Sequence, residues 1–440
     1  MKKIFFSIFI VFFTTPLLAQ KLETDKLDSY FKKMDSTKNY MLSAVIWKND
    51  KVVYTNQTGY SDVENQTKPN NETKYRIGSI SKTFTAAMIM KAIEDGKLTF
   101  NSKLAEFFPE IQNSPEISIN HLLTHQSGLY NFTDDPHYLE YSTSKKSRQQ
   151  MLDIIYKHQP AFAPGTKQEY SNTNYVLLSY ILEDIYHKPY SKILEDQIIK
   201  PLGLKNTYYG KKINPADNEA FSYVKKGDKW EKMPETDMSI PIGAGSIVST
   251  PSDLMIFADA LFNGKVIKEE SLKQMIDGKT AYRKGLFLMP FGAKKGFGHT
   301  GGIDGFTSVF VYFPKGKVGA AITSNGVNLD NNNDILIFLL KTAFNMPVEV
   351  PDFKIITVPK EVLEKYVGTY ASADLPLKIS IRLEENKLVA QATGQSSFVL
   401  TPKDEKNFVF GPAGIHLEFI PRNNQMILKQ AGQKFIFTKE

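Results

Sequence analysis

The spacing of hydrophobic residues predicts a helix and then a β-hairpin at the start of the folded chain. Residues 41–47 and 51–54 are mostly apolar, and they flank the turn-forming pair Asn49-Asp50, as the two strands of a hairpin would. Before them, four apolar residues recur at helical spacing: Leu27, Tyr30, Phe31 and Met34. We therefore expect the order helix, strand, turn, strand.

A long helical stretch follows, and strands return only after it. From residue 79 to about 204 the pattern is mostly helical, with predicted stops at Gly96, Pro164-Gly165 and Pro201. Strands are predicted over three later ranges, 285–290, 305–314 and 318–324, and a closing helix over about 333–344. Early and late strands around a helical middle indicate one α+β domain, whose sheet is assembled from both ends of the segment.

The last part of the chain has a different, purely alternating pattern. The pattern of apolar and polar residues changes over residues 347–359. Short alternating apolar runs then begin at about residue 370 and continue to the end. The runs lie at 377–383, 388–390, 398–400, 408–410, 416–420, 426–428 and 435–437. Turn signals separate them: Glu385-Asn386, Gly394, Gly411, Asn423-Asn424 and Gly432. This spacing predicts a second, all-β domain, a small closed barrel or sandwich.

The first twenty residues have the three-part plan of a secretory signal. Lys2 and Lys3 precede a mostly apolar run over residues 4–13, and Leu17-Leu18-Ala19 ends the segment, so we place the cut after Ala19. A retained membrane anchor is disfavoured because Thr14, Thr15 and Pro16 interrupt the run. The predicted organisation is a signal at 1–19, a main domain at 20–347, a linker at 348–360 and a barrel at 361–440, in a periplasmic or secreted protein without a stable membrane span.

Composition excludes several kinds of chemistry. The chain has no cysteine, so disulfides, thiolate zinc sites and cysteine nucleophiles are ruled out together. The net charge of +7 includes the two lysines of the signal and is not gathered into a basic cluster, which makes nucleic acid an improbable partner. No glycine-rich nucleotide fingerprint occurs. We expect a small-molecule or peptide substrate, no cofactor and no metal, and the oligomeric state stays open.

Ser79 and Lys82 are the strongest candidates for catalysis. Their Ser-x-x-Lys spacing places a hydroxyl and an amine one helical turn apart, so the amine can accept the hydroxyl proton during nucleophilic attack. The same spacing occurs at Ser29/Lys32, Ser142/Lys145 and Ser222/Lys225, for which we expect ordinary solvated settings. The helix after Ser79 is apolar almost all round, so Lys82 should be partly desolvated with a lowered pKa, although a lysine that reaches solvent is the alternative.

Three further motifs are weak when each is taken alone. Tyr170-Ser171-Asn172 precedes a predicted helix from about residue 174 to 185, where Tyr170 could shuttle protons or Asn172 could merely cap the helix. His299-Thr300-Gly301-Gly302 leads into the strand predicted at 305–313, and its glycines would expose an N–H to an oxyanion or simply form a bend. His121 and His125 have a metal-pair spacing but lack a third ligand, so structural packing is favoured.

The Ser-x-x-Lys, Tyr-x-Asn and His-Thr-Gly motifs, occurring in this order along the chain, indicate a family resemblance. Residues 22–346 resemble the class C β-lactamase and serine DD-peptidase superfamily. Further sequence segments that support the resemblance lie at 75–86, 121–129, 164–166, 201–204 and 243–250. The resemblance implies an antiparallel sheet flanked by terminal helices, with a helical subdomain, and a C-terminal part similar to a lipocalin-like barrel. It also implies the following roles: Ser79 as nucleophile, Lys82 as base, Tyr170 as proton relay, Asn172 as partner of substrate and Lys82, and the N–H groups of Ser79 and Gly302 as oxyanion hole.

One departure from the family pattern bears on the substrate. The triplet that is Lys-Thr-Gly in classical β-lactamases and DD-peptidases is His299-Thr300-Gly301 here, and a neutral histidine holds a substrate carboxylate less firmly than a lysine. By resemblance to D-aminopeptidases and esterases with this histidine, we expect a serine hydrolase of small esters, amides or D-amino-acid peptides. The alternatives are a β-lactamase, a D-Ala-D-Ala carboxypeptidase or a non-catalytic protein that binds cell-wall peptides.

Overall fold

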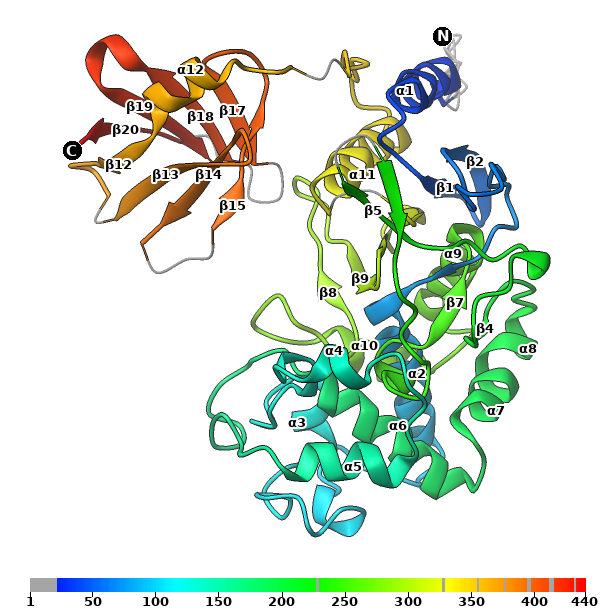
Figure 1. Ribbon diagram of the computed structural model, residues 1–440. Helices are drawn as coiled ribbons and strands as arrows, with labels where there is room; N and C mark the ends of the chain where they lie inside the picture. The colour runs from blue at the N-terminus through cyan, green and yellow to red at the C-terminus, as the bar shows by residue number, and fades with distance from the viewer. Residues whose placement is uncertain are drawn as a thin grey trace, which may run out of the picture.

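The computed structural model describes most of the chain after the predicted signal (Figure 1). The described residues are 22–226, 229–326, 329–353, 356–375, 377–393, 397–410, 415–430 and 433–440. The predicted signal at 1–19 with its cut after Ala19 lies outside them, as do the predicted turn residues Gly394, Gly411 and Gly432.

The main sheet has six antiparallel strands in the order β2-β1-β11-β10-β9-β8. Their bounds are β1 (Leu42–Lys48), β2 (Lys51–Thr58), β8 (Phe287–Leu288), β9 (Phe297–Ile303), β10 (Phe306–Phe313) and β11 (Val318–Ser324). Strands β1 and β2 form the predicted hairpin, and Asn49 and Asp50 between them have φ angles of 53° and 64°, as a tight hairpin turn requires. Strand β1 also pairs with β11 from Leu42↔Ser324 to Lys48↔Val318, which confirms that the sheet is built from both ends of the segment.

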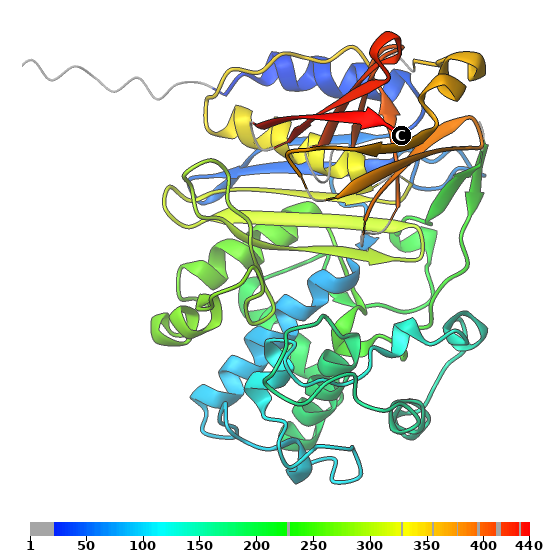
Figure 2. The same cartoon turned by 90° about the vertical axis from the view of Figure 1, so that its left-hand side faces the viewer.

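Alternating residues of these strands enter two separate cores. Ala44 and Ile46 of β1 face the terminal helices α1 (Thr24–Ser36) and α11 (Leu329–Ala343), whereas Val45 and Trp47 face the opposite side. That opposite side is covered by helix α9 (Pro251–Phe262), which contacts β1, β10 and β11. Figure 2 shows α1 and α11 above the sheet and the helical part of the chain below it. The resulting layers are those expected for the α+β fold.

The helical part is built around two buried helices, α2 (Ser81–Glu94) and α6 (Asn172–Tyr186), which pack against each other. The other helices are α3 (Ile119–Leu123), α4 (Tyr138–Tyr141), α5 (Arg148–Tyr156), α7 (Tyr190–Leu194), α8 (Lys200–Leu202) and α10 (Glu269–Ile276). Two small sheets complete it: β3 (Tyr75–Arg76), β7 (Ile247–Ser249) and β4 (Tyr208–Tyr209) form one, and β5 (Tyr223–Lys226) and β6 (Lys229–Lys232) the other.

The predicted helix stop at Pro201 is wrong by two residues. Helix α8 directly continues α7 through the π-helical turn η4 (Glu195–Ile199), so Pro201 lies in the last turn of a continuous helix, which ends at Gly203 with φ 63°. The predicted stop at Gly96 is confirmed, since α2 ends at Glu94 and Gly96 has φ 69°.

The C-terminal part is a nearly closed antiparallel barrel of nine strands in the order β15-β14-β13-β12-β20-β19-β18-β17-β16. Their bounds are β12 (Gly368–Ala371), β13 (Lys378–Glu384), β14 (Lys387–Ala392), β15 (Phe398–Val399), β16 (Thr401–Pro402), β17 (Asn407–Phe410), β18 (Ile415–Ile420), β19 (Gln425–Gln430) and β20 (Gln433–Lys439). Each predicted alternating run falls on one of these strands. The edge strands β15 and β16 are consecutive in sequence, and the buried Leu400 joins them at the seam of the barrel.

The connection between the two parts packs on both. Val348 belongs to the core under α1 and α11, and Phe353 lies edge-on against Tyr30 at a ring distance of 5.1 Å. Val358 belongs to the barrel core, which the short helix α12 (Lys360–Leu363) adjoins. Within the described ranges, no helix has the length and hydrophobicity needed to cross a bilayer.

Candidate active site

Ser79 and Lys82 meet at the N-terminal end of the most buried helix. Ser79 lies in the 3₁₀ turn η1 (Gly78–Ile80), directly before α2, and Lys82 lies in the first turn of α2. Ser79 therefore precedes the α-helix rather than beginning it. The Ser79 Oγ and Lys82 Nζ atoms are 2.9 Å apart, so the predicted juxtaposition of hydroxyl and amine is present.

Lys82 is fully buried and does not reach solvent. Its Nζ also donates hydrogen bonds to Asn172 Oδ1 at 2.7 Å and to the Ala244 carbonyl oxygen at 2.8 Å. Burial lowers the pKa of Lys82 well below its ordinary value. A neutral amine has two N–H donors and one lone pair. Because the two carbonyl oxygens can only accept, in this neutral form they take both donors and leave the lone pair for the Ser79 hydroxyl.

The Ala244 carbonyl is a site group that the motif analysis did not single out. It lies in the 3₁₀ turn η6 (Ile242–Ala244), which packs against α2 and α6. A Cβ atom at Gly243 would lie only 2.7 Å from Ser179 Cβ, so a glycine there lets this turn approach the two helices closely enough to reach Lys82. A backbone acceptor leaves no residue-type signal, which is why its role was missed.

Tyr170 lies over the Lys82 amine just before α6. The Lys82 Nζ is 4.9 Å from the centre of the Tyr170 ring, and the ring stacks on His125 at 4.4 Å. The buried His125 in turn accepts a hydrogen bond at Nδ1 from the Ser171 N–H at 3.2 Å. Burial raises the pKa of Tyr170, while a hydrogen bond with Ser79 opposes the rise, so the phenol is protonated at neutral pH.

The side-chain amide of Asn172 forms hydrogen bonds through both its nitrogen and its oxygen. It is the first residue of α6, and its Nδ2 donates to Thr133 Oγ1 at 3.0 Å while its Oδ1 accepts from Lys82. Its backbone N–H donates to Asn131 Oδ1 at 2.8 Å. Asn131, not Asn172, therefore caps this helix end, and the capping alternative for Asn172 is wrong.

The segment His299–Gly302 lies inside strand β9 rather than in a bend before a strand. Its glycines are required there because β9 passes next to η1 at backbone distance. A Cβ atom at Gly301 would collide with the Ile77 carbonyl oxygen, and one at Gly78 (φ 51°) would lie 2.7 Å from the Gly302 nitrogen. The backbone around Ser79 and that of Gly302 are thereby brought together.

His299 is buried and close enough to Lys82 to feel its charge, but it is not among the residues that line the cavity. Its Nδ1 lies 2.5 Å from the Thr300 carbonyl oxygen and its ring stacks on Phe287 at 4.2 Å, so Nδ1 carries the proton. Burial, with a smaller contribution from Lys82, lowers the pKa of His299 to about 3. The imidazole is thus neutral at physiological pH. Thr300 is exposed, and of the four predicted residues only Gly302 lines the cavity.

Ser79 opens onto a cavity of about 550 Å³. Ser79, Asn172, Ala244 and Gly302 form its reactive side, and the rest is formed mainly by apolar and hydroxyl side chains, with Asp304, the partner of Arg76, as the one charged residue in the lining. These other lining residues include Phe132, Thr133, Tyr138, Leu139, Ser142, Thr143 and Thr236. A volume of this size is typical of sites for small ligands.

The expected solvated setting is wrong for Ser142 and Ser222, whose side chains are buried. Ser142 belongs to the cavity wall, and its carbonyl accepts from the Asp237 N–H at 2.8 Å. The Ser222 hydroxyl accepts from the Gly305 N–H at 3.1 Å. Ser29 is exposed, as predicted.

A buried arginine fixes one wall of the cavity. Arg76 contacts Asp304 at 2.9 Å and Glu235 at 3.1 Å, and it donates to the Thr236 carbonyl at 2.9 Å. These contacts join strand β3 to the turn after β9 and to residues 235–236. Since Arg76 lies three residues before Ser79, the same contacts anchor the segment that carries Ser79.

The histidine pair at 121 and 125 serves packing, as expected. His121 takes part in the cap of α3 with Ser118, and His125 supports Tyr170. Among the described residues, no group of three metal-ligating side chains comes together.

Comparisons with known proteins agree with this geometry. The model of the beta-lactamase family matches residues 28–341. A putative penicillin-binding protein, PbpX of Bacillus subtilis (strain 168), is 25% identical over 302 residues, which are 68% of this chain and 73% of that protein. The D-amino acid amidase of Ochrobactrum anthropi SV3, solved with D-phenylalanine, superposes with a TM-score of 0.66 at 26% identity, over 73% of this chain and 99% of that one.

A further solved structure shares the fold over nearly the whole chain. The octameric penicillin-binding protein homologue from Pyrococcus abyssi has a TM-score of 0.67 at 23% identity, and the match covers 94% of this chain and 100% of that one. The likeness therefore extends into the C-terminal barrel.

Proposed function

The chain belongs to the beta-lactamase family and is a serine hydrolase, and from this premise we propose that it hydrolyses amides and esters of small D-amino-acid derivatives through an acyl-enzyme on Ser79. The observation that carries the proposal is the Lys82 amine, fully buried between two carbonyl acceptors and the Ser79 hydroxyl. A binding protein has no use for such an activated pair, because burying a lysine costs free energy that only its function repays.

In the first step, the Ser79 oxygen attacks the substrate carbonyl carbon as its proton passes to the Lys82 lone pair. The proton moves along the 2.9 Å line between Oγ and Nζ. The negative charge that develops on the carbonyl oxygen is stabilised in our proposal by the N–H groups of Ser79 and Gly302. The close approach of β9 to η1 supports this assignment.

In the second step, the bond to the amine or alcohol breaks and the leaving group needs a proton. Tyr170 is placed to donate it, because its phenol is protonated and hydrogen-bonded to Ser79. Lys82, now an ammonium, returns its proton to the phenolate. Water then attacks the acyl-enzyme, and the same groups take its proton and restore the Ser79 hydroxyl. Asn172 keeps the amine oriented throughout.

The substrate class follows from the charge of the site. His299 is neutral and lies outside the cavity wall, so it supplies no cation for a substrate carboxylate. Amides and esters without a free carboxylate suit such a site better than β-lactams or peptides that end in a free carboxylate. The similarity to a D-amino acid amidase supports the D-configuration. We further propose that residues 1–19 direct export and that the enzyme acts in the periplasm or outside the cell.

A substrate panel tests the proposal. We expect D-phenylalanine amide and a short acyl ester to be hydrolysed at least about tenfold faster, in kcat/KM, than a chromogenic cephalosporin or a D-Ala-D-Ala peptide, because only the last two present a carboxylate. Faster turnover of the cephalosporin would make the protein a β-lactamase, and faster turnover of the peptide would make it a carboxypeptidase. L-phenylalanine amide is the matched control for configuration.

The His299→Gln variant tests whether this side chain acts without charge. Because the pKa of His299 lies at about 3, the native residue does not titrate between about pH 5 and 8. The variant should therefore keep the shape of the pH profile of kcat/KM across this range, with a loss in rate smaller than about tenfold. Disappearance of a titration near pH 6 to 7 in the variant would show instead that His299 works as a cation.

A further inference from the structure

Among the described residues, the barrel interior is closely packed at one end. At the filled end, next to α12 and the following 3₁₀ turn η7 (Glu364–Tyr366), aromatic rings pack against one another: Tyr366, Tyr370, Phe408 and Phe419. Met426 and Phe437 are fully buried in the same cluster. This end has the close packing of an ordinary protein core.

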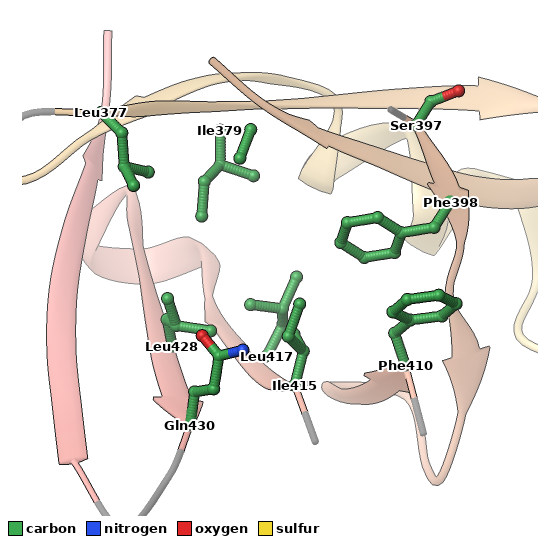
Figure 3. Close-up of a pocket in the computed structure, with 10 residues that line it drawn as sticks. Leu377, Ile379, Ser397, Phe398, Phe410, Ile415, Leu417, Leu428 and Gln430 are labelled. Atoms are coloured by element: carbon green, nitrogen blue, oxygen red, sulfur yellow. The ribbon is translucent and has the colours of Figure 1, made fainter. Parts of the chain in front are cut away.

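Toward the other end of the barrel, the described residues line an apolar cavity of about 350 Å³ (Figure 3). Its lining comes from β13, β14, β15, β17, β18 and β19 and from Leu377 and Ser397 beside them: Leu377, Ile379, Ala392, Ser397, Phe398, Phe410, Ile415, Leu417, Leu428 and Gln430. None of these residues is charged, and only Ser397 and Gln430 have polar side chains. The cavity therefore suits an uncharged, mainly apolar molecule.

The cavity lies beside the seam between β15 and β16, the two end strands of the described sheet. Phe398 of β15 and Phe410 of β17 stack there at a ring distance of 4.3 Å and an interplanar angle of 21°, and they form one wall. Figure 3 shows this pair facing the aliphatic side chains of Ile379, Leu417 and Leu428, with the Gln430 amide beside Leu428. A slot between two rings and an aliphatic wall is shaped for an elongated chain.

The size of the cavity sets the size of its occupant. An apolar cavity of about 150 Å³ stays dry in water and takes up benzene. This cavity has more than twice that volume, and it lies in the lower part of the range for small-molecule sites, about 300 to 1,000 Å³. A larger side chain at Ala392 would take up part of this space.

We propose that the barrel binds a medium-length aliphatic molecule with one uncharged hydrogen-bonding end, such as a fatty alcohol. The chain lies between the phenyl pair and the aliphatic wall, and the polar end meets the Gln430 amide. This site is separate from the Ser79 cavity, with which it shares no lining residue, and it does not depend on the proposed hydrolytic function.

The test is fluorescence of N-phenyl-1-naphthylamine added to the full chain, followed by displacement with 1-decanol. We expect the emission to rise on binding and to fall as 1-decanol replaces the probe. Ala392→Phe, which places a ring in the cavity, should weaken binding of both at least tenfold. Val399→Phe is the matched control, since Val399 is 46% exposed and lies outside the cavity lining, and it should bind as the native chain does.

Two further variants keep the result decisive. Gln430→Leu should retain the probe but require several-fold more 1-decanol for displacement. Should Ala392→Phe fail to fold, Ala392→Leu carries the same comparison, with far-UV circular dichroism and thermal unfolding of the full chain as the check of folding. Absence of any emission change with the native chain, or equal binding by the Ala392 and Val399 variants, would overturn the proposal.

Discussion

Replacing Ser79 by alanine is expected to abolish both ester hydrolysis and labelling by a fluorophosphonate probe. The substitution removes the only hydroxyl that faces the Lys82 amine at 2.9 Å among the described contacts, and no acyl-enzyme can then form. Loss of a single oxyanion donor in comparable sites costs a factor of about 10² to 10³, and loss of the nucleophile should cost more. The measurement is the intact mass of the purified protein after probe treatment, together with the rate of ester hydrolysis.

Ser29→Ala is the matched control for this experiment. Ser29 has the same spacing to Lys32 as Ser79 has to Lys82, but it is exposed on α1. This variant should take up one adduct, as the native chain does. Ser142→Ala is a poorer control because Ser142 belongs to the cavity wall. An adduct on folded Ser79→Ala would refute the assignment, and no adduct on either protein would favour a binding protein without catalysis.

Replacing Lys82 by methionine should lower the acylation rate by more than about 10³-fold while Ser79 stays in place, because the base that accepts its proton is gone. In the native protein the neutral amine is the active form. Burial lowers the pKa of Lys82, so the acylation rate should rise with pH and reach its plateau well below 10.5, the ordinary pKa of lysine. The rate of fluorophosphonate labelling as a function of pH measures both effects, with Lys32→Met as the matched control.

Asn172→Asp sharpens this test. The new carboxylate would lie within hydrogen-bond distance of Lys82 Nζ, and an opposite charge so close raises a lysine pKa by about 1 to 3 units. The pH profile of labelling should move to higher pH by such an amount. A profile that does not move, or a native midpoint near 10.5, would show that Lys82 is not the base.

The sequence predicts the reactive pair well because both residues lie within one helical turn. Local spacing brings Ser79 to Lys82, and the apolar residues that follow them indicate burial of the helix. Strand β9 was missed for the opposite reason: Gly298, Gly301 and Gly302 have low strand propensity, and only pairing with β10 and β8 makes them a strand. Burial of Ser142 depends on segments that are distant in the sequence. The residues next to Ser142 in the chain therefore do not predict it.

In the barrel, too, local sequence predicts the strands but not the site that they form together. Its strands follow from strict alternation of apolar and polar residues, which needs only local sequence. The cavity depends on which side chains from six strands and the adjoining segments meet at one end and on how much space they leave, and no single run of residues contains that information.

The pairing of β1 with β11 has a consequence for how the protein is made. Residues 42–48 cannot find their partner strand until residues 318–324 have been synthesised. At roughly 5 to 20 residues per second, the wait is on the order of tens of seconds. Throughout this time, strand β1, which is apolar on both faces, is paired only with its hairpin neighbour β2. Contacts so distant in sequence also slow folding itself. During biosynthesis, the apolar residues of this first hairpin therefore stay without their partner strand for most of the time that the chain is being made.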